Sequence, residues 1–255
     1  MVIPLKLLIL LLILVSCNIV DDFQKSDLSL KFFKLNNHGF YVYPNEKKYN
    51  QIIKRESEKH KIDWMFVKSV IIKESHYSEY LVSNTGAVGL MQLMPRKESY
   101  ITENYNNFIK ARKQKKNRDG ERVYKGKTAE YWGLLYRKDL LSLYRKYKKS
   151  KSQLYKIDKR FNPKWNIIEG VRHLAIEYHY FKKRNGSNYK TRILASSSYN
   201  AGRRSVIKHK NKPEFDSIPI NGQTEIYSIA VNRIYNALKH GDGQIHQNDI
   251  WVLYQ

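Results

Sequence analysis

The sequence of 255 residues has only one cysteine, Cys17. One cysteine excludes an internal disulfide framework and a zinc site built from several cysteines. The chain also lacks a collagen repeat, a long heptad array and a polar low-complexity tract, which excludes the fibrous classes. Hydrophobic residues make up 42% of the chain and aromatic residues 13%, which is enough for a packed core. The length predicts one or two domains.

The apolar run Leu7–Val15 is shorter than the roughly 20 residues that cross a hydrocarbon core. With Lys6 before it, the run is typical of the hydrophobic part of a secretory signal. It closes on Leu-Val-Ser-Cys at Cys17, which resembles the bacterial lipobox, where the cysteine receives lipid. We therefore expect a lipoprotein signal peptide at 1–16, then a lipidated Cys17 and a tether over 17–44. The alternative is an uncleaved hydrophobic tail with an incidental cysteine.

Acidic residues are scarce, since 23 Asp and Glu stand against 47 Lys and Arg and give a net charge of +24. The excess is concentrated in 96–160, where 21 cations face 7 acids. Such a charge attracts nucleic acid, an anionic membrane surface or an anionic wall polymer. A solvated lysine-rich surface is the alternative, because a charge run alone specifies no partner. Export argues against nucleic acid, so we expect no specific nucleic-acid partner.

Helical periodicity dominates the pattern, and βαβ alternation is missing. Asn45 and Asp63 each precede an apolar stripe and are predicted helix caps, and the second helix should run to about Ser75. Further helices are predicted from Thr128, after Pro163 and Asn166, from about Arg192 to Tyr199 before Gly202, and across Ile226, Ile229, Ala230, Ile234 and Ala237. The stripe predicted for the helix from Thr128 is Trp132, Leu135, Leu140, Leu141 and Tyr144. We therefore predict a mainly α fold.

Glu74 breaks the most regular of these stripes. Val67, Val70 and Ile71 precede it at helical spacing, so a carboxylate stands where the pattern requires an apolar residue. Two interpretations remain open on this feature alone. Glu74 is either a buried glutamate in a structural hydrogen-bond network, or a general acid whose pKa is raised by loss of water.

Four further motifs follow Glu74-Ser75 in order, and each one alone is a weak signal. They are Gly-Leu-Met-Gln within Ser83 to Pro95, Asn162-Pro163 with Asn166-Ile167, Ser198-Tyr199-Asn200-Ala201-Gly202, and Gln223-Thr224 with Tyr227. Together they resemble the catalytic domain of the soluble-lytic-transglycosylase (SLT) family, which has a lysozyme-like fold. The resemblance implies a lysozyme-like catalytic domain over 45–255 with a basic, partly helical insertion at 96–160.

The resemblance also implies a reaction. Glu74 would serve as the only acid and base, first protonating the oxygen between N-acetylmuramic acid and N-acetylglucosamine. The substrate's own acetamido group would replace a second carboxylate. Ionised Glu74 would then deprotonate the muramic C6 hydroxyl, which gives a 1,6-anhydro end. The implied partner is the peptidoglycan glycan strand, with a membrane contact through Cys17, and the reaction needs no cofactor.

Seven other residues match substrate-binding positions of the family: Ser75, Ser83, Met91, Gln92, Tyr199, Asn200 and Tyr227. Ser75 either orients the carboxylate or caps the helix end. Tyr199 is expected to hydrogen-bond Glu74 or the reacting sugar, with an aromatic core position as the alternative. Gln92 and Asn200 would bind sugar groups or close loops. Met91 would form the floor of the glycan groove, whereas Ser83 and Tyr227 match positions near the cleft.

Two features depart from the family pattern. Gln223 stands where the family has a glutamate, so a charge that usually lines the cleft is neutral. The 96–160 segment is longer than the usual connection, and it would form a lid, a docking surface for the anionic wall or a site for an envelope protein. Two other functions therefore stay open. One is a hydrolytic lysozyme, which usually needs a second carboxylate about 6.5–9.5 Å away, and the other is a non-catalytic wall-binding or assembly protein.

Metal chemistry is not expected. His173 and His179 are six positions apart, which is not the spacing of a helical metal-binding pair.

Overall fold

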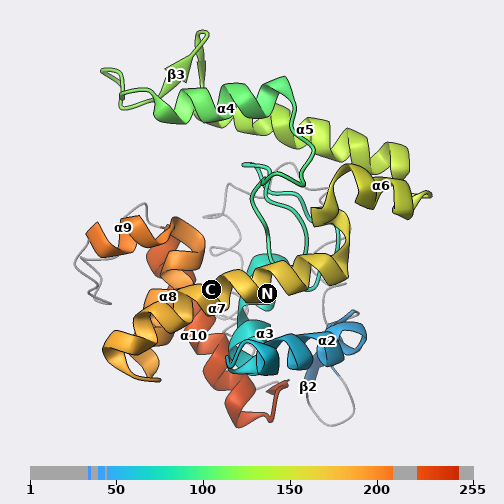
Figure 1. Cartoon of the computed structure of the whole chain (residues 1–255), viewed down its shortest axis with the longest axis vertical. Coiled ribbons are helices and arrows are strands. Elements are labelled where there is room, and N and C mark those ends of the chain that lie inside the picture. Colours follow the sequence, from blue (N-terminus) through green and yellow to red (C-terminus); the bar gives the residue numbers. More distant parts are fainter. Residues whose placement is uncertain (1–33, 36–39, 44, 209–222, 247–255) are drawn as a thin grey trace, which may run out of the picture.

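The computed structural model describes residues 34–35, 40–43, 45–208 and 223–246 (Figure 1). The signal peptide, Cys17 and most of the tether that we predict lie outside these ranges. Among the described residues, no helix combines the length and the apolar character that a membrane span requires.

Helices dominate the described chain, which confirms the prediction of a mainly α fold. They are α2 (Glu46–Lys59), α3 (Trp64–Ser75), α4 (Glu103–Lys113), α5 (Ala129–Tyr147), α6 (Lys151–Ile157), the 3-10 helix η1 (Lys159–Phe161), α7 (Pro163–Asn185), α8 (Tyr189–Ala201), α9 (Arg203–Lys208) and α10 (Gln223–His240). The strands are short: β1 (Lys34–Leu35), β2 (Phe40–Val42), β3 (Val123–Tyr124), β4 (Lys127–Thr128) and β5 (Ile245–His246).

The helix ends follow from local chemistry. Asp63 caps α3 as predicted, because its side chain accepts a hydrogen bond from the Met65 amide at 2.9 Å. Thr128 caps α5 in the same way, and Gly202 ends α8. Asn166 was expected before its helix, but it lies inside the first turn of α7, since Asn162 is the cap.

Helix α3 lies in the middle of the main hydrophobic core. The stripe residues Val67, Val70 and Ile71 are fully buried, as their spacing predicts. Helices α2 and α10 pack against α3, while α7 packs against α2 and α8. This arrangement surrounds the helix that carries Glu74 on several sides (Figure 1).

A buried ion pair joins three parts of this core. The Lys68 ammonium donates to the Glu46 carboxylate of α2 and to the Gly243 carbonyl after α10, and both side chains are nearly inaccessible. Burial lowers the pKa of Lys68, and the charge of Glu46 acts in the opposite direction. The pair therefore holds the start of α2 and the turn after α10 against α3.

A small antiparallel sheet adds the N-terminal part of the described chain to this core. Its strand order is β1-β2-β5, and Tyr41 of β2 pairs with Ile245 of β5. Tyr43 follows β2 and is only 1% exposed. The end of the segment predicted as a tether, 17–44, is therefore part of the folded domain.

Residues 103–157 form an arm above the main core, which is made of α4, the β3-β4 hairpin, α5 and α6 (Figure 1). Helix α4 was not predicted from the sequence, and the stripe predicted for α5 is confirmed only in part, since Leu141 and Tyr144 are half-buried against the core that contains Leu140. Of the five residues predicted for this stripe, only Leu140 is buried. The other buried residues of α5 are Gly133, Tyr136 and Leu143. Gly133 lets α5 approach the loop before it, because a Cβ at this position would lie 2.9 Å from the Asn84 carbonyl oxygen. In α10 the predicted stripe fails at Ile226, which is 58% exposed.

Replacement of Glu46 tests the buried ion pair. Glu46→Gln should lower the free energy of unfolding by about 3 kcal/mol, because it leaves the Lys68 charge buried without its partner. Urea unfolding measures the difference. Glu58→Gln, at an exposed position of the same helix, is the matched control and should change little. Equal effects of the two variants would contradict the role of this ion pair.

Candidate active site

Glu74 lies in the last turn of α3, and its side chain is only partly accessible. The hydroxyl of Tyr227, on α10, donates a hydrogen bond of 2.7 Å to its carboxylate. Helix α10 therefore supplies the direct partner of a carboxyl group that remains at the surface of the core.

The surroundings of Glu74 favour its protonated form. Burial raises its pKa to about 7, although the Tyr227 hydrogen bond and the positive charge of Lys73 both lower it. Burial also lowers the pKa of the neighbouring Lys73. A carboxyl group with this pKa holds its proton in a large fraction of molecules at neutral pH, and it releases the proton easily.

Ser75 connects the end of α3 to the following loop. Its Oγ lies 2.8 Å from the Leu90 carbonyl oxygen and 3.1 Å from that of Ile71. The residue is 1% exposed, and both of these hydrogen bonds lie within the protein and fix the loop to the end of α3. The chain then reverses through His76, which adopts the left-handed conformation at φ 48°.

Asn166 of α7 forms hydrogen bonds with backbone groups of the loop over 82–93. The Asn166 amide donates to the carbonyls of Val88 (2.7 Å) and Arg160 (3.0 Å), and its oxygen accepts from the Met91 amide at 2.8 Å. Only glycine fits at position 89, because a Cβ there would lie 2.4 Å from the Asn166 side-chain nitrogen. In the sequence, Asn166 belongs to a family motif, and nothing there indicates that it binds this loop.

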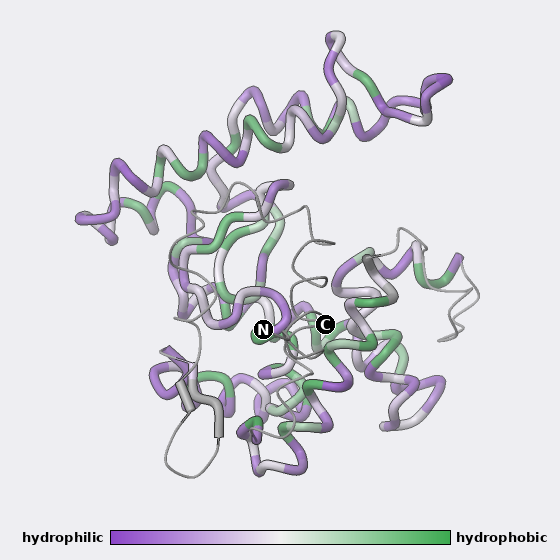
Figure 2. The backbone as a smooth tube through the Cα atoms, turned by 180° about the vertical axis from the view of Figure 1, so that it is seen from behind, coloured by the Kyte–Doolittle hydropathy of each residue, from purple (hydrophilic) through white to green (hydrophobic). Residues whose placement is uncertain are grey.

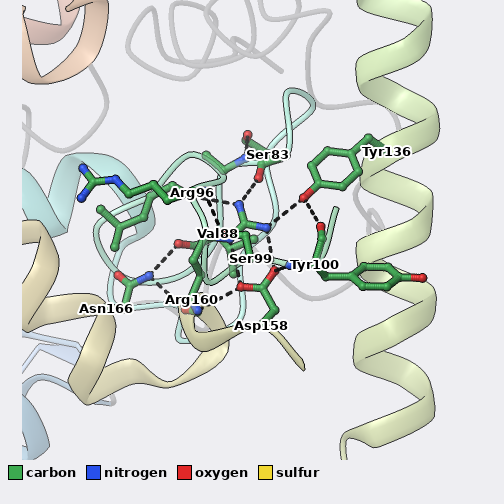
Figure 3. Close-up of polar contacts among 12 residues, drawn as sticks. Ser83, Val88, Arg96, Ser99, Tyr100, Tyr136, Asp158, Arg160 and Asn166 are labelled. Atoms are coloured by element: carbon green, nitrogen blue, oxygen red, sulfur yellow. Dashed lines mark hydrogen bonds and ion pairs between the residues drawn. The ribbon is translucent and has the colours of Figure 1, made fainter. Parts of the chain in front are cut away.

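The buried side chain of Arg160 also binds backbone groups of this loop (Figure 3). Arg160 forms an ion pair of 2.7 Å with Asp158 and donates to the carbonyls of Gly86 (2.7 Å) and Leu93 (3.1 Å). It also donates to the hydroxyl of Tyr136 on the arm. In the sequence, Arg160 is one cation among the 21 of a basic segment, and nothing there marks it as buried.

Met91 is fully buried in the main hydrophobic core. Its side chain packs against Gly170 of α7, where a Cβ would come within 2.3 Å of the sulfur. Its carbonyl oxygen accepts a hydrogen bond of 2.7 Å from the hydroxyl of Tyr199. The backbone and the side chain of Met91 are therefore fixed by α7 and α8.

Tyr199 was expected to hydrogen-bond Glu74, but the structure gives that bond to Tyr227. Burial raises the pKa of Tyr199, and the negative charge of Glu74 adds to this effect. Its ring centre lies 5.0 Å from that of His173. Tyr227 of α10 therefore contacts the carboxyl group directly, whereas Tyr199 of α8 contacts the loop through the Met91 carbonyl.

Three predicted site residues make hydrogen bonds within the protein. Gln92 donates to the carbonyls of Leu81 (3.1 Å) and Gly89 (2.8 Å), which is the loop-closing alternative. The Ser83 hydroxyl accepts from the amide of Ala87, four residues further on, at 2.9 Å. Asn200 is exposed, and its side-chain oxygen accepts from Thr224, which joins α8 to α10.

The structure therefore brings Glu74, Tyr227, Tyr199 and Met91 together. It places Ser83 and Gln92 in the supporting loop, Ser75 at the end of α3 where it binds that loop, and Asn200 at the junction of α8 and α10. The side chain of Gln223 lies outside the described part. Within that part, no group of three or more His, Cys, Asp or Glu side chains could hold a metal ion. The Glu74 carboxyl group, with a pKa of about 7, can both donate and accept a proton at neutral pH.

A mainly helical domain with a carboxyl group at the end of its central helix is consistent with a lysozyme-like fold. Comparison with known families matches the transglycosylase SLT domain to residues 51–119 and 142–219, more than half of the chain. The chain belongs to this family. The unmatched segment, 120–141, covers the hairpin and much of α5, and it is shorter than the insertion at 96–160 that the motifs suggest.

One curated relative is the "membrane-bound lytic murein transglycosylase F" of Desulfosudis oleivorans. It is 30% identical over 67 residues, which is 26% of this chain. The aligned part covers only 15% of the length of that relative.

Replacement of Asn166 tests the support of the loop. Asn166→Ala should lower the free energy of unfolding by about 3 kcal/mol, because it leaves the Met91 amide and the Arg160 carbonyl without partners and removes one of the two hydrogen bonds to the Val88 carbonyl. Asn185→Ala, which removes one hydrogen bond to Phe181, is the control and should cost about 1 kcal/mol. Denaturant unfolding of both variants measures the difference, and a loss for Asn166→Ala no larger than the control would refute the assigned role.

The pKa of Glu74 predicts a pH-dependent stability. A carboxyl pKa of about 7 in the fold, against its usual 4.5, stabilises the fold below pH 4.5, and this contribution is lost as the pH rises through 7. Glu74→Gln should therefore gain stability over the wild type between these pH values, by up to about 3 kcal/mol. Urea unfolding at both ends of the range measures the gain. A difference that does not change with pH would contradict the raised pKa.

Proposed function

We propose that the protein is a peptidoglycan lytic transglycosylase that uses Glu74 as its acid and base. Its substrate is the β-1,4 bond between N-acetylmuramic acid and N-acetylglucosamine. The observation that carries the proposal is the partly accessible Glu74 carboxyl, which has a pKa of about 7 in a chain of the SLT family. An ordinary surface glutamate would be ionised at neutral pH and could not donate a proton efficiently.

In the first step, protonated Glu74 donates its proton to the glycosidic oxygen. The bond between this oxygen and the muramic C1 breaks, and N-acetylglucosamine leaves with a hydroxyl group. The substrate's acetamido group stabilises the cationic C1, so the protein needs no second carboxylate. Glu74 is now ionised, and the Tyr227 hydrogen bond and the Lys73 charge stabilise this form.

In the second step, the Glu74 carboxylate takes the proton from the muramic C6 hydroxyl. The freed oxygen bonds to C1 and closes the 1,6-anhydro ring. Burial drives this proton transfer, because the desolvated carboxylate regains its neutral form. The acid is then ready for another cycle, without any cofactor.

The surrounding residues divide into two proposed groups. Tyr199 and the exposed Asn200 would contact the sugars, together with Tyr227 where it flanks the carboxyl group. Ser75, Ser83, Met91 and Gln92 would shape the site, because their hydrogen bonds or packing lie within the protein. This division assigns the supporting loop to precise positioning of the glycan strand.

We also propose that the mature chain is a lipoprotein anchored at Cys17 and facing the cell wall. The apolar run before Cys17 supports this proposal, and the relative that matches part of the chain is named membrane-bound. The signal peptide would cover 1–16, the tether would begin at Cys17, and the catalytic domain predicted over 45–255 would also include the strands β1 and β2 before it. Such an anchor would keep the enzyme beside its insoluble substrate.

Digestion of purified peptidoglycan tests the function. The wild type should release fragments with 1,6-anhydromuramic ends, and Glu74→Gln should reduce the rate by about 10³-fold or more, because one group serves as both acid and base. Glu58→Gln, on the exposed face of α2, is the control and should retain activity. Mass spectrometry of the fragment ends gives the readout.

Two outcomes would contradict the proposal. Reducing ends in place of anhydro ends would identify a hydrolytic lysozyme. A folded wild type that binds the wall and releases nothing would identify a non-catalytic binding or assembly protein.

A further inference from the structure

The end of the arm is a concentrated basic surface. We define the arm tip as residues 110–127, the end of α4, the hairpin and the turns around it. Its sequence has two acids, Asp119 and Glu121, against nine cations: Lys110, Arg112, Lys113, Lys115, Lys116, Arg118, Arg122, Lys125 and Lys127. All residues from 112 to 122 are exposed. Figure 2 shows this end of the arm largely in the hydrophilic colour.

The arm itself gives the tip its shape. Arg122 donates to the Arg112 carbonyl at 2.8 Å, and the Asn117 side chain accepts from the Glu121 amide at 2.8 Å. Lys110 and Lys125 both lie over the ring of Tyr124, 5.5 and 5.9 Å from its centre. The cations are therefore presented on a folded hairpin beyond the main core (Figure 1).

Apolar side chains stand beside these cations at the start of α5. Tyr131 is 41% exposed and Leu134 is 38% exposed, and their spacing places them on one face of the helix. Lys127 lies over the Tyr131 ring, 5.0 Å from its centre. Exposed aromatic and aliphatic groups next to lysines are typical of surfaces that enter the boundary between lipid headgroups and acyl chains.

We propose that the arm tip docks on an anionic phospholipid bilayer. The cations would face the headgroup phosphates, and Tyr131 and Leu134 would enter the interface. Binding of a soluble polyanion would require only the cations. The exposed side chains of Tyr131 and Leu134 therefore favour a bilayer as the partner. Together with the acyl chains proposed at Cys17, the arm would supply the second signal of a stable two-signal attachment. The docking does not depend on the proposed catalytic function.

Protection from trypsin tests this proposal on the full chain. The protein is reconstituted into phosphatidylcholine vesicles with or without about one third anionic phosphatidylglycerol. The readout is the cleavage rate within the arm tip divided by the rate at Lys182-Lys183, an exposed internal reference on α7. This ratio should fall about tenfold on anionic vesicles and recover at about 0.5 M NaCl. An unchanged ratio would overturn the proposal.

A paired variant separates the bilayer from other polyanions. Tyr131→Ser with Leu134→Ser keeps every charge and should lose most of the protection. Ile176→Ser with Tyr189→Ser, at positions 46% and 50% exposed on other helices, is the matched control and should keep it. Full protection of the first variant, or equal protection of the wild type by soluble polyphosphate, would show polyanion binding without a bilayer and would refute docking.

Discussion

The site depends on one constraint, that the Glu74 carboxyl must be kept from water and yet remain within reach of a ligand. Its place at the last turn of α3 meets both needs, because the helix runs through the core and ends at the surface. Burial then raises its pKa to about 7 against the opposing effects of Tyr227 and Lys73. A carboxyl group balanced in this way can both give and take a proton.

The rest of the domain is organised to hold this position. Ser75 links the end of α3 to the loop over 82–93, and Asn166 and Arg160 bind the loop through its backbone groups. Arg160 also bonds Tyr136, whose ring would collide with any side chain at position 86. The base of the arm is thus part of the support of the site, whereas the arm tip lies apart from it.

The sequence alone was sufficient to predict the helical fold and to select Glu74 as the candidate acid, because both follow from regular apolar stripes, one of which has a carboxylate at an apolar position. It could not separate Tyr227 from Tyr199, since each lies on a helix whose rotation depends on tertiary packing. The roles of Arg160 and Asn166 could not be predicted for a related reason, because a polar side chain that binds distant backbone carbonyls leaves no local pattern. Helix α4 was not predicted because polar residues dominate its sequence and only Asn107, Phe108 and Ala111 are buried, and the buried face of α5 was predicted only in part.

Direct titration of Glu74 tests the central claim, that this carboxyl group is a proton donor at neutral pH. Carbon NMR of a carboxyl-labelled sample, with Glu74→Gln for assignment, reports the pKa of this one group. We predict a value of about 7 in the wild type and a higher value in Tyr227→Phe, which lacks the hydrogen bond that lowers it. A value near 4.5 in both proteins would show an ordinary, hydrated glutamate and would contradict the role of Glu74 as a proton donor.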